Sequence, residues 1–370
     1  MRPFENLSMT ALLEYASQQL QLNMPLVVYN KPNANQLIGI FQQDDLLYFV
    51  ENFNETGFVF APFEGKKVLI PENQSVIKIA DFVTNLNKKN VFFPKAESDN
   101  EAKDKYKAIV QKAIDTIQAG ELSKVVLSRK EKVDLTHFDA MVLFKKLLQE
   151  YPTAFTYCFF HPKVGLWFGA FSEQLLKLEN TIFQTTAIAG THIYEESKQI
   201  IWENKEKKEQ QFVTDFILDK IKKVITNITV SDPYTLKAGN IVHIKTDIQG
   251  ILNSDSNLKE VLEILHPTPA VCGLPVDSAK NFIQDNEGYD REYYTGFLGE
   301  INTDFISKEK NTDLYVNLRC VKIEIASNLA ITKAHIYMGG GITKDSIPDN
   351  EWIETVNKSM TIKKILDCRF

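Results

Sequence analysis

The spacing of apolar residues changes repeatedly along this 370-residue chain, and these changes predict a mixture of helices and strands. Apolar residues three and four positions apart predict helices near 9–20, 101–119, 137–150, 258–264 and 276–286. Short alternating or continuous apolar runs predict strands at 26–29, 46–50, 57–60, 68–70, 124–133, 154–160, 165–169, 181–188, 241–248, 293–301, 313–325 and 329–338. Because the strands come in groups with interspersed helices, the order favours an α+β fold.

A polar tract at 97–105 divides the chain into two parts of different character. Residues 1–96 predict a helix and short strands and carry no chemical motif, whereas every motif described below lies in residues 97–370. We therefore expect the second part to be a catalytic domain that holds the site, with the first part integrated into the same fold.

The stretch 202–221 predicts a further helix with a distinctive polar face. Its apolar residues recur at helical spacing and are Phe212, Val213, Phe216, Ile217 and Ile221. Glu206 and Glu209 lie three positions apart, so both carboxylates project from one face.

Near the C-terminus, the triplet Gly339, Gly340 and Gly341 leads through a polar turn into another predicted helix, which carries Glu351, Glu354 and Lys358. These three side chains share a face because they lie three and seven positions apart. The glycines have no side chains to block an anion from their backbone N–H groups. The segment therefore combines bare amides, two carboxylates and an ammonium group.

Each acidic pair also has an ordinary interpretation. Acidic residues near a helix start favour the macrodipole, and Glu354 with Lys358 is a common surface pair. The two pairs together favour a functional interpretation, because facing carboxylates can hold Mg²⁺, a cation that prefers oxygen ligands and keeps several waters. The two helices thus predict a site for Mg²⁺ and a small polyanion.

Composition narrows the class of protein. With 44% hydrophobic residues, a net charge of -6 and a pI near 5.7, the chain is typical of a soluble globular protein. An acidic chain without a basic block is unsuited to nucleic acid, which is bound through clustered Lys and Arg. We see neither a signal peptide nor an apolar run of about 18 residues, so we expect a cytoplasmic protein with no membrane partner.

Eight segments, in order between about 100 and 365, resemble the chorismate-utilising enzymes and most closely the isochorismate synthases. They are Lys124-Val-Val-Leu-Ser-Arg129, Phe168-Gly-Ala-Phe-Ser-Glu173, Ala187-Ile-Ala-Gly-Thr191, Lys208-Glu-Gln-Gln-Phe-Val213, Leu265-His-Pro-Thr-Pro-Ala-Val-Cys-Gly-Leu-Pro275, Tyr289-Asp-Arg-Glu-Tyr-Tyr-Thr-Gly296, Leu318-Arg319 and the glycine-to-helix segment 337–358. The resemblance implies extended antiparallel sheets with helices packed outside, an active site in a central cleft, and a family-variable part before residue 97.

The resemblance also implies a substrate, chorismate, and a cofactor, Mg²⁺, which grips the ring carboxylate in this family. Glu209 and Glu354 fall where the family ligates the metal directly, and Glu206 and Glu351 where it holds the metal's waters. The positions that contact the two substrate carboxylates are Gly190, Thr191, Tyr294, Arg319, Gly339, Gly340, Gly341 and Lys358. His266 falls where a family histidine orients a substrate hydroxyl.

The reaction implied is addition of water at C2 of chorismate with loss of the C4 hydroxyl, which gives isochorismate. Lys124 would be the base, for which its pKa has to fall from about 10.4 toward neutrality. Glu173 would protonate the departing hydroxyl, which requires a raised carboxyl pKa. The relatives that add ammonia usually have glutamine in place of Lys124, and one of them has a nucleophilic lysine in place of Ala189.

Two alternatives stay open. Salicylate synthase shares the base and the acid and then eliminates pyruvate, and a binding protein would use the acidic helices for recognition alone. The sequence departs from the family pattern at Ser172, His192 and Gln210. It does not distinguish a menaquinone from a siderophore pathway, and the family permits a monomer.

Overall fold

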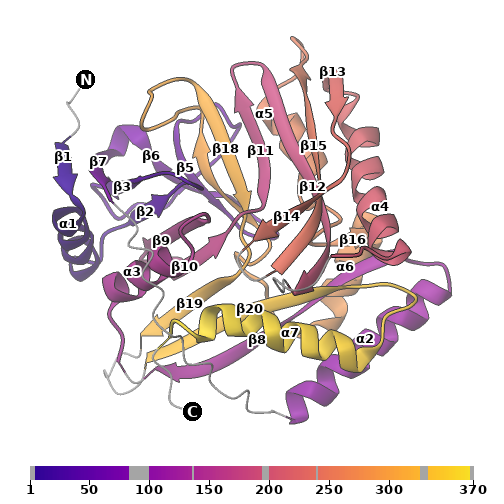
Figure 1. Cartoon of the computed structure of the whole chain (residues 1–370). Helices are drawn as coiled ribbons and strands as arrows, with labels where there is room; N and C mark the ends of the chain where they lie inside the picture. Colours follow the sequence, from indigo (N-terminus) through magenta and orange to yellow (C-terminus); the bar gives the residue numbers. More distant parts are fainter. Residues whose placement is uncertain are drawn as a thin grey trace.

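The structure is a computed structural model that describes residues 5–82, 100–135, 137–193, 200–238, 241–325 and 332–366. Within these residues, twenty strands form two ten-stranded sheets, accompanied by seven α-helices (Figure 1). The predicted α+β class and the antiparallel sheets are confirmed, since β1 and β7 are the one parallel pair among the described neighbours. The division predicted near residue 97 falls outside the described residues.

The first sheet contains strands from both ends of the chain. In spatial order its strands are β1 (Glu5–Ser8), β7 (Ser75–Asp81), β3 (Gln36–Gln42), β2 (Leu26–Asn30), β9 (Phe155–His161), β10 (Gly165–Phe171), β19 (Cys320–Ile325), β20 (Thr332–Ile342), β8 (Lys124–Leu135) and β16 (Gly273–Leu274).

The second sheet is built in the same mixed way. Its strands are β13 (Ile225–Val230), β15 (Ile241–Leu252), β12 (Ile182–Ile193), β11 (Gln174–Glu179), β18 (Asn311–Val316), β17 (Phe297–Ile301), β5 (Gly57–Ala61), β6 (Val68–Pro71) and β4 (Tyr48–Phe49), with β14 (Tyr234–Ala238) paired to β15. The pairings of β2 with β9 and of β5 with β17 place strands of the first hundred residues in both sheets.

Four buried apolar clusters show how the layers pack. An aromatic cluster joins the two sheets, including Phe60 of β5 and Phe159 of β9, whose ring centroids are 4.2 Å apart. The other three lie under helices, which are α1 (Met9–Gln21) and α3 (Ala140–Glu150) on the first sheet, α4 (Asn204–Ile221) and α5 (Leu258–Leu265) on the second, and α2 (Asn100–Gln118), α6 (Val276–Asn286) and α7 (Pro348–Lys363) beside β8 and β20.

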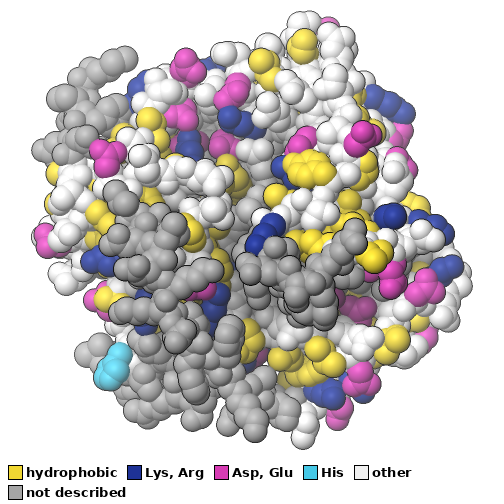
Figure 2. All heavy atoms as spheres, in the orientation of Figure 1, with side chains coloured by type: hydrophobic (Ala, Val, Ile, Leu, Met, Phe, Trp, Pro, Cys, Tyr) yellow, Lys and Arg dark blue, Asp and Glu magenta, His cyan; other side chains and the backbone are white. Residues whose placement is uncertain are grey.

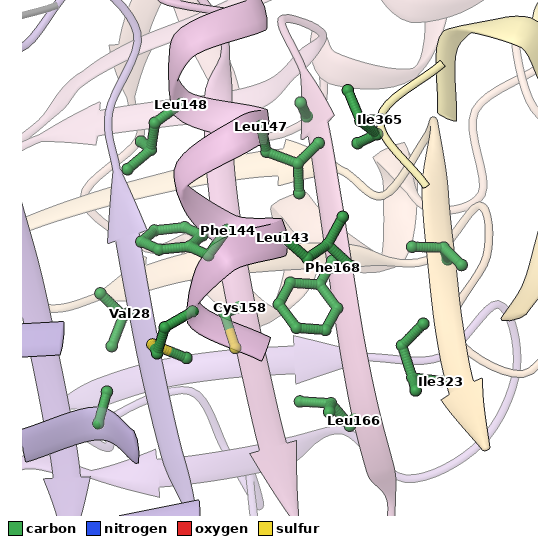
Figure 3. Packing of buried hydrophobic residues seen from close by; sticks show 14 of the residues in the cluster. Val28, Leu143, Phe144, Leu147, Leu148, Cys158, Leu166, Phe168, Ile323 and Ile365 are labelled. Carbon is green, nitrogen blue, oxygen red and sulfur yellow. The ribbon is translucent and has the colours of Figure 1, made fainter. Parts of the chain in front are cut away.

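Helix α3 illustrates how the sequence builds one of these layers. Asp139 caps the helix, since its Oδ1 accepts a hydrogen bond from the Val142 N–H at 2.8 Å. The apolar face of the helix packs on the first sheet, with Leu143 beside Phe168 of β10 and with Phe144 on the side of Val28 and Cys158 (Figure 3). Because Phe144 is fully buried, truncating it to alanine would cost about 3–5 kcal/mol of stability.

Two of the places where the chain passes from one sheet to the other lie next to each other. One change lies between β10 and β11, and the other between β18 and β19. The sequence pattern predicted a single strand over 313–325, and this prediction is wrong because Arg319 adopts a left-handed conformation (φ 46°) that ends one strand before the next begins. A single long apolar run in the sequence therefore contributes one strand to each sheet.

The remaining differences concern strands near polar or loop segments. The predicted strand 293–301 begins at Phe297, because Tyr289 to Gly296 form a loop instead. Strand β20 extends through the glycine triplet, so the polar turn follows Ile342. The strands β1, β3, β7, β11, β13, β14 and β16 were not predicted.

Acidic and basic side chains are interspersed over the face seen in Figure 2. Among the described helices, none combines the length and apolar character needed to cross a bilayer. Cys158, Cys272 and Cys320 are buried free thiols.

Candidate active site

Two candidate residues lie where the chain crosses between the sheets. Glu173 lies between β10 and β11, and Arg319 lies immediately before β19. The two crossings are hydrogen-bonded to each other, since the Val316 N–H donates to the Glu173 carbonyl oxygen at 2.9 Å and the Ala170 N–H to that of Arg319 at 3.4 Å. The sheet topology therefore brings an acid and a cation together from positions nearly 150 residues apart in sequence.

The glycine triplet lies beside this crossing. Strand β20 pairs with β19 only as far as Ile336, whereas its pairing with β8 continues to Ile342. In the described register the glycines of β20 therefore have a strand on one side only. On the other side, Lys358 Nζ donates to the Gly339 carbonyl oxygen at 2.8 Å. In an antiparallel strand the N–H of a residue points to the same side as its carbonyl, so the Gly339 and Gly341 amides face this edge.

The predicted acidic residues converge on the same glycines. A Cβ atom on Gly340 would lie 3.5 Å from an oxygen of Glu351 and equally far from one of Glu354. A Cβ atom on Gly341 would lie 3.2 Å from Glu209 Oε1 and 3.0 Å from Lys124 Cε. Helices α4 and α7, nearly 150 residues apart in sequence, thus both present carboxylates to one short stretch of backbone.

Two of these carboxylates form ion pairs with the two candidate lysines. Lys124 Nζ lies 2.7 Å from Glu209 Oε1, and Lys358 Nζ lies 2.5 Å from Glu354 Oε1. Lys124 is nearly buried, with 7% of its side chain exposed, so the Glu209 carboxylate compensates for much of the hydration that this ammonium group has lost.

The four predicted acidic residues fit Mg²⁺ in the chemistry of their donors, because all are carboxylates and Mg²⁺ prefers oxygen ligands. They are Glu206, Glu209, Glu351 and Glu354. They are not gathered around a common centre: the described residues include no group of three or more His, Cys, Asp or Glu side chains arranged to hold a metal. Two of the four carboxylates, Glu209 and Glu354, are paired instead with the ammonium groups of Lys124 and Lys358.

The electrostatic setting of Glu173 suits an acid. Burial raises its pKa from the ordinary value of 4.5 to about 7, and the opposing effects of Arg319, Lys124 and Lys358 limit the rise. The carboxyl group therefore keeps a substantial protonated fraction at neutral pH, and the three cations around it are the predicted base and two predicted carboxylate-binding groups.

A histidine that the sequence analysis did not select lies closer to these charges than the one it did. Burial lowers the pKa of His243 on β15 to about 4, with Arg319 and Lys358 lowering it further, and its Nδ1 lies 2.9 Å from the Gly190 carbonyl oxygen. His266 follows α5, packs on Phe297 and has Lys67 and Lys280 as its neighbouring charges. An alternating strand around His243 gave no signal, because a lone histidine there is usually structural.

The other predicted contact residues are placed as follows. Gly190 has a left-handed conformation (φ 70°), and a Cβ atom there would come within 3.1 Å of Glu206 Cβ, so the backbone of β12 packs closely on α4. The Tyr294 hydroxyl lies 3.0 Å from the position of a Cβ on Gly339, and its ring stacks on Tyr337. Thr191 lies in β12, but its side chain is outside the described part.

Two of the three departures from the family pattern can be described. Gln210 is buried beside Glu209 and donates to Thr246 Oγ1 at 2.7 Å and to Thr214 Oγ1 at 2.8 Å, so it ties α4 to β15. Ser172 is exposed at the crossing next to Glu173. The side chain of His192 lies outside the described residues.

Comparison with known proteins agrees with this arrangement. Over residues 67–367 the chain matches the family model described as chorismate binding enzyme. It is 26% identical over 272 residues to isochorismate synthase EntC of Escherichia coli, covering 70% of this chain and 66% of that protein. It is also 26% identical over 277 residues to anthranilate synthase component 1 of Thermococcus kodakarensis, covering 72% and 61%.

A solved structure shares the fold. The menaquinone-specific isochorismate synthase MenF from Escherichia coli superposes with a TM-score of 0.74 at 19% identity, over 92% of this chain and 88% of that one. The matched segments span about two thirds or less of the sequence relatives, which include enzymes with different products. The family match itself covers most of the chain, and the protein therefore belongs to the chorismate-binding enzymes.

Proposed function

We propose that this protein is an Mg²⁺-dependent isochorismate synthase that isomerises chorismate. The observation that carries the proposal is the partly buried Glu173 carboxyl at the crossing between the sheets, with its pKa raised to about 7, in the field of Lys124, Arg319 and Lys358. A protonated acid at neutral pH, a lysine and two further cations are what a water addition to a dianion requires.

In the proposed complex, chorismate places its carboxylates on the cations and on the glycine edge. Arg319 and Lys358 offer charge, and the Gly339 and Gly341 amides offer N–H donors beside them. Mg²⁺, when bound, would be held by Glu209 and Glu354 directly, with Glu206 and Glu351 holding its waters, and would neutralise the ring carboxylate.

The proposed reaction balances with one water added and one released. Neutral Lys124 takes a proton from water while the water oxygen bonds to C2. Both ring double bonds shift, from C1–C2 to C1–C6 and from C5–C6 to C4–C5, the C4–O bond breaks, and Glu173 gives its proton to the leaving oxygen. His266 is proposed to orient a substrate hydroxyl, and strand β12 is held to β15 by His243, whose Nδ1 donates to the Gly190 carbonyl oxygen at 2.9 Å.

Anthranilate synthases are equally similar to this chain, so reaction type rests on particular residues. Lys124 favours water over ammonia as the nucleophile, because water needs a base and free ammonia does not. Ala189 is buried in β12 and offers only a methyl group, which excludes a covalent lysine intermediate at that position. Both residues support isochorismate as the product.

Salicylate synthase is the alternative enzyme, since it shares the base and the acid and adds pyruvate elimination. A metal-dependent binding protein is the non-catalytic alternative. Residues 1–96 would form a family-variable part of the same monomeric, cytoplasmic protein, whose product feeds a menaquinone or siderophore pathway.

Product analysis tests the proposal. The purified protein is incubated with chorismate and Mg²⁺, with and without ammonium, and the products are separated by chromatography. Isochorismate alone supports the proposal, whereas salicylate with pyruvate identifies the alternative enzyme and anthranilate an amine-adding one. Chorismate bound without turnover would instead indicate a binding protein.

A further inference from the structure

Strand β11 is irregular immediately after Glu173. Gln174 is opposite Tyr315 of β18, but Leu176 is opposite Leu314, so the register shifts between them. A register shift of this kind bends the strand and changes the direction of neighbouring side chains, and it is common next to active sites. The direction of the Glu173 side chain therefore depends on how this irregularity is fixed.

A side-chain contact fixes it. The Gln174 amide nitrogen Nε2 donates to Asp313 Oδ1 at 2.7 Å, and the Tyr315 hydroxyl donates to the other oxygen, Oδ2, at 3.1 Å. Asp313 is 8% exposed, so its two carboxylate oxygens have exchanged most of their water for these donors. Residues on β11 and β18 are thereby held on either side of the register shift.

The charges that act on the Asp313 carboxylate include that of Lys31, which directly follows β2. Burial raises the pKa of Asp313, and Lys31 and Lys177 oppose the rise. Opposite Asp313 on the neighbouring strand β17 lies Glu300, which forms an ion pair with Lys31 Nζ at 2.6 Å. The anchor for Gln174 is thus part of a buried charge network and not a free surface group.

We propose that the Gln174–Asp313 contact is a positioning device that holds the Glu173 carboxyl toward the ring oxygen it protonates; this inference rests on the proposed function. Glu173 directly precedes β11, so anchoring Gln174 fixes the backbone from which the Glu173 side chain projects, and Arg319, Lys124 and Lys358 are the charges that act on that side chain. Gln174 and Asp313 act through Glu173 and touch no reacting atom.

The first test replaces Gln174 with a side chain of similar length that cannot donate. Gln174→Met should lower kcat by on the order of 10²-fold, as expected for a misplaced reacting group, and should leave the chorismate KM and the Mg²⁺ requirement within about twofold. Gln184→Met, the same change on the neighbouring strand β12, is the matched control and should keep wild-type kinetics. A wild-type kcat in Gln174→Met overturns the inference.

A polarity swap keeps the test informative if single variants fold poorly. Gln174→Glu places two carboxylates together and should lose more activity than Gln174→Met. Adding Asp313→Asn restores one donor and one acceptor with the charge exchanged, and should recover kcat to within about tenfold of wild type. A double variant that folds like wild type yet recovers no activity contradicts the inference.

A direct titration separates this inference from the proposed function. The Glu173 carboxyl carbon is followed by ¹³C NMR against pH and assigned with Glu173→Gln. Gln174→Met should move its midpoint by about one unit, because the carboxyl shifts relative to its three cations, while Gln184→Met leaves it unchanged. An unmoved midpoint overturns the positioning role, whatever product the wild type forms. A wild type that forms no isochorismate overturns the proposed function alone.

Discussion

Lys124 Nζ lies 2.7 Å from Glu209 Oε1, so the candidate base is paired with a candidate metal ligand. In this pair the ammonium donates a hydrogen bond and has no lone pair for a water proton. A cation bound at Glu209 would compete with the ammonium for the same oxygen. We therefore expect metal binding and release of the base to be linked through this one carboxylate.

Replacing Lys124 tests its role as the base. Lys124→Gln keeps a donor of similar reach for Glu209 but removes the basic nitrogen, so kcat should fall by on the order of 10²–10⁴-fold. Chorismate binding in the presence of Mg²⁺, measured by calorimetry, should stay close to wild type. Isochorismate formation at the wild-type rate in this variant would rule out Lys124 as the base.

A titration of activity against Mg²⁺ tests the four carboxylates. Glu209→Ala and Glu354→Ala should raise the Mg²⁺ concentration for half activity strongly, because Mg²⁺ demands near-ideal octahedral geometry. Glu206→Ala and Glu351→Ala should have milder effects if these residues act through water.

Asp215→Asn, on the same helix as Glu209 and bonded to Gln211, is the control and should leave the titration unchanged. Equal effects of all four alanine variants would contradict the division into direct and water-mediated ligands.

Local patterns predicted the helices that carry the acids, because capping and 3.6-residue periodicity act within one segment. They did not predict where the chain leaves one sheet for the other. Arg319 interrupts a long apolar run, and its left-handed conformation gives no hydrophobic signal. Likewise His243 gains its neighbours Arg319 and Lys358 only when β15, β19 and α7 come together. The site depends on topology, and the resemblance to a family supplied what periodicity could not.

The glycine triplet gives a graded prediction. A Cβ on Gly339 would lie 2.7 Å from the Leu127 carbonyl oxygen, a backbone atom, so Gly339→Ala should destabilise the fold by about 1–3 kcal/mol. In Gly341→Ala the crowded atoms belong to the side chains of Lys124 and Glu209, which can move. That variant should keep a wild-type melting temperature while losing about tenfold or more in kcat.

Gly340→Ala makes ordinary contacts at 3.5 Å and provides the comparison within the same strand. Thermal melting and kcat measured together on the three variants check the order. If Gly341→Ala retained wild-type kcat and Mg²⁺ requirement, the close packing of Lys124 and Glu209 on this glycine would be functionally irrelevant.

Glu173 should show opposite effects on activity and on stability. Its pKa is 4.5 ordinarily and about 7 in the folded protein, because burial disfavours the charged form. Between these values the folded state binds more protons than the unfolded state, so stability falls as pH rises from about 4.5 through about 7. Above that range the folded protein carries the full free-energy cost of ionising the Glu173 carboxyl away from water. The side chain in Glu173→Gln has no proton to lose, so the stability of this variant does not include that cost.

Glu173→Gln should therefore match wild type in urea denaturation near pH 4.5 and exceed it by about 3 kcal/mol at pH 8, while its turnover collapses. In wild type, kcat/KM should decline as pH rises past about 7, where the proton for the leaving hydroxyl is lost. A stability difference between Glu173→Gln and wild type that did not grow with pH would show that Glu173 is already ionised in the folded protein, and would remove it as the acid.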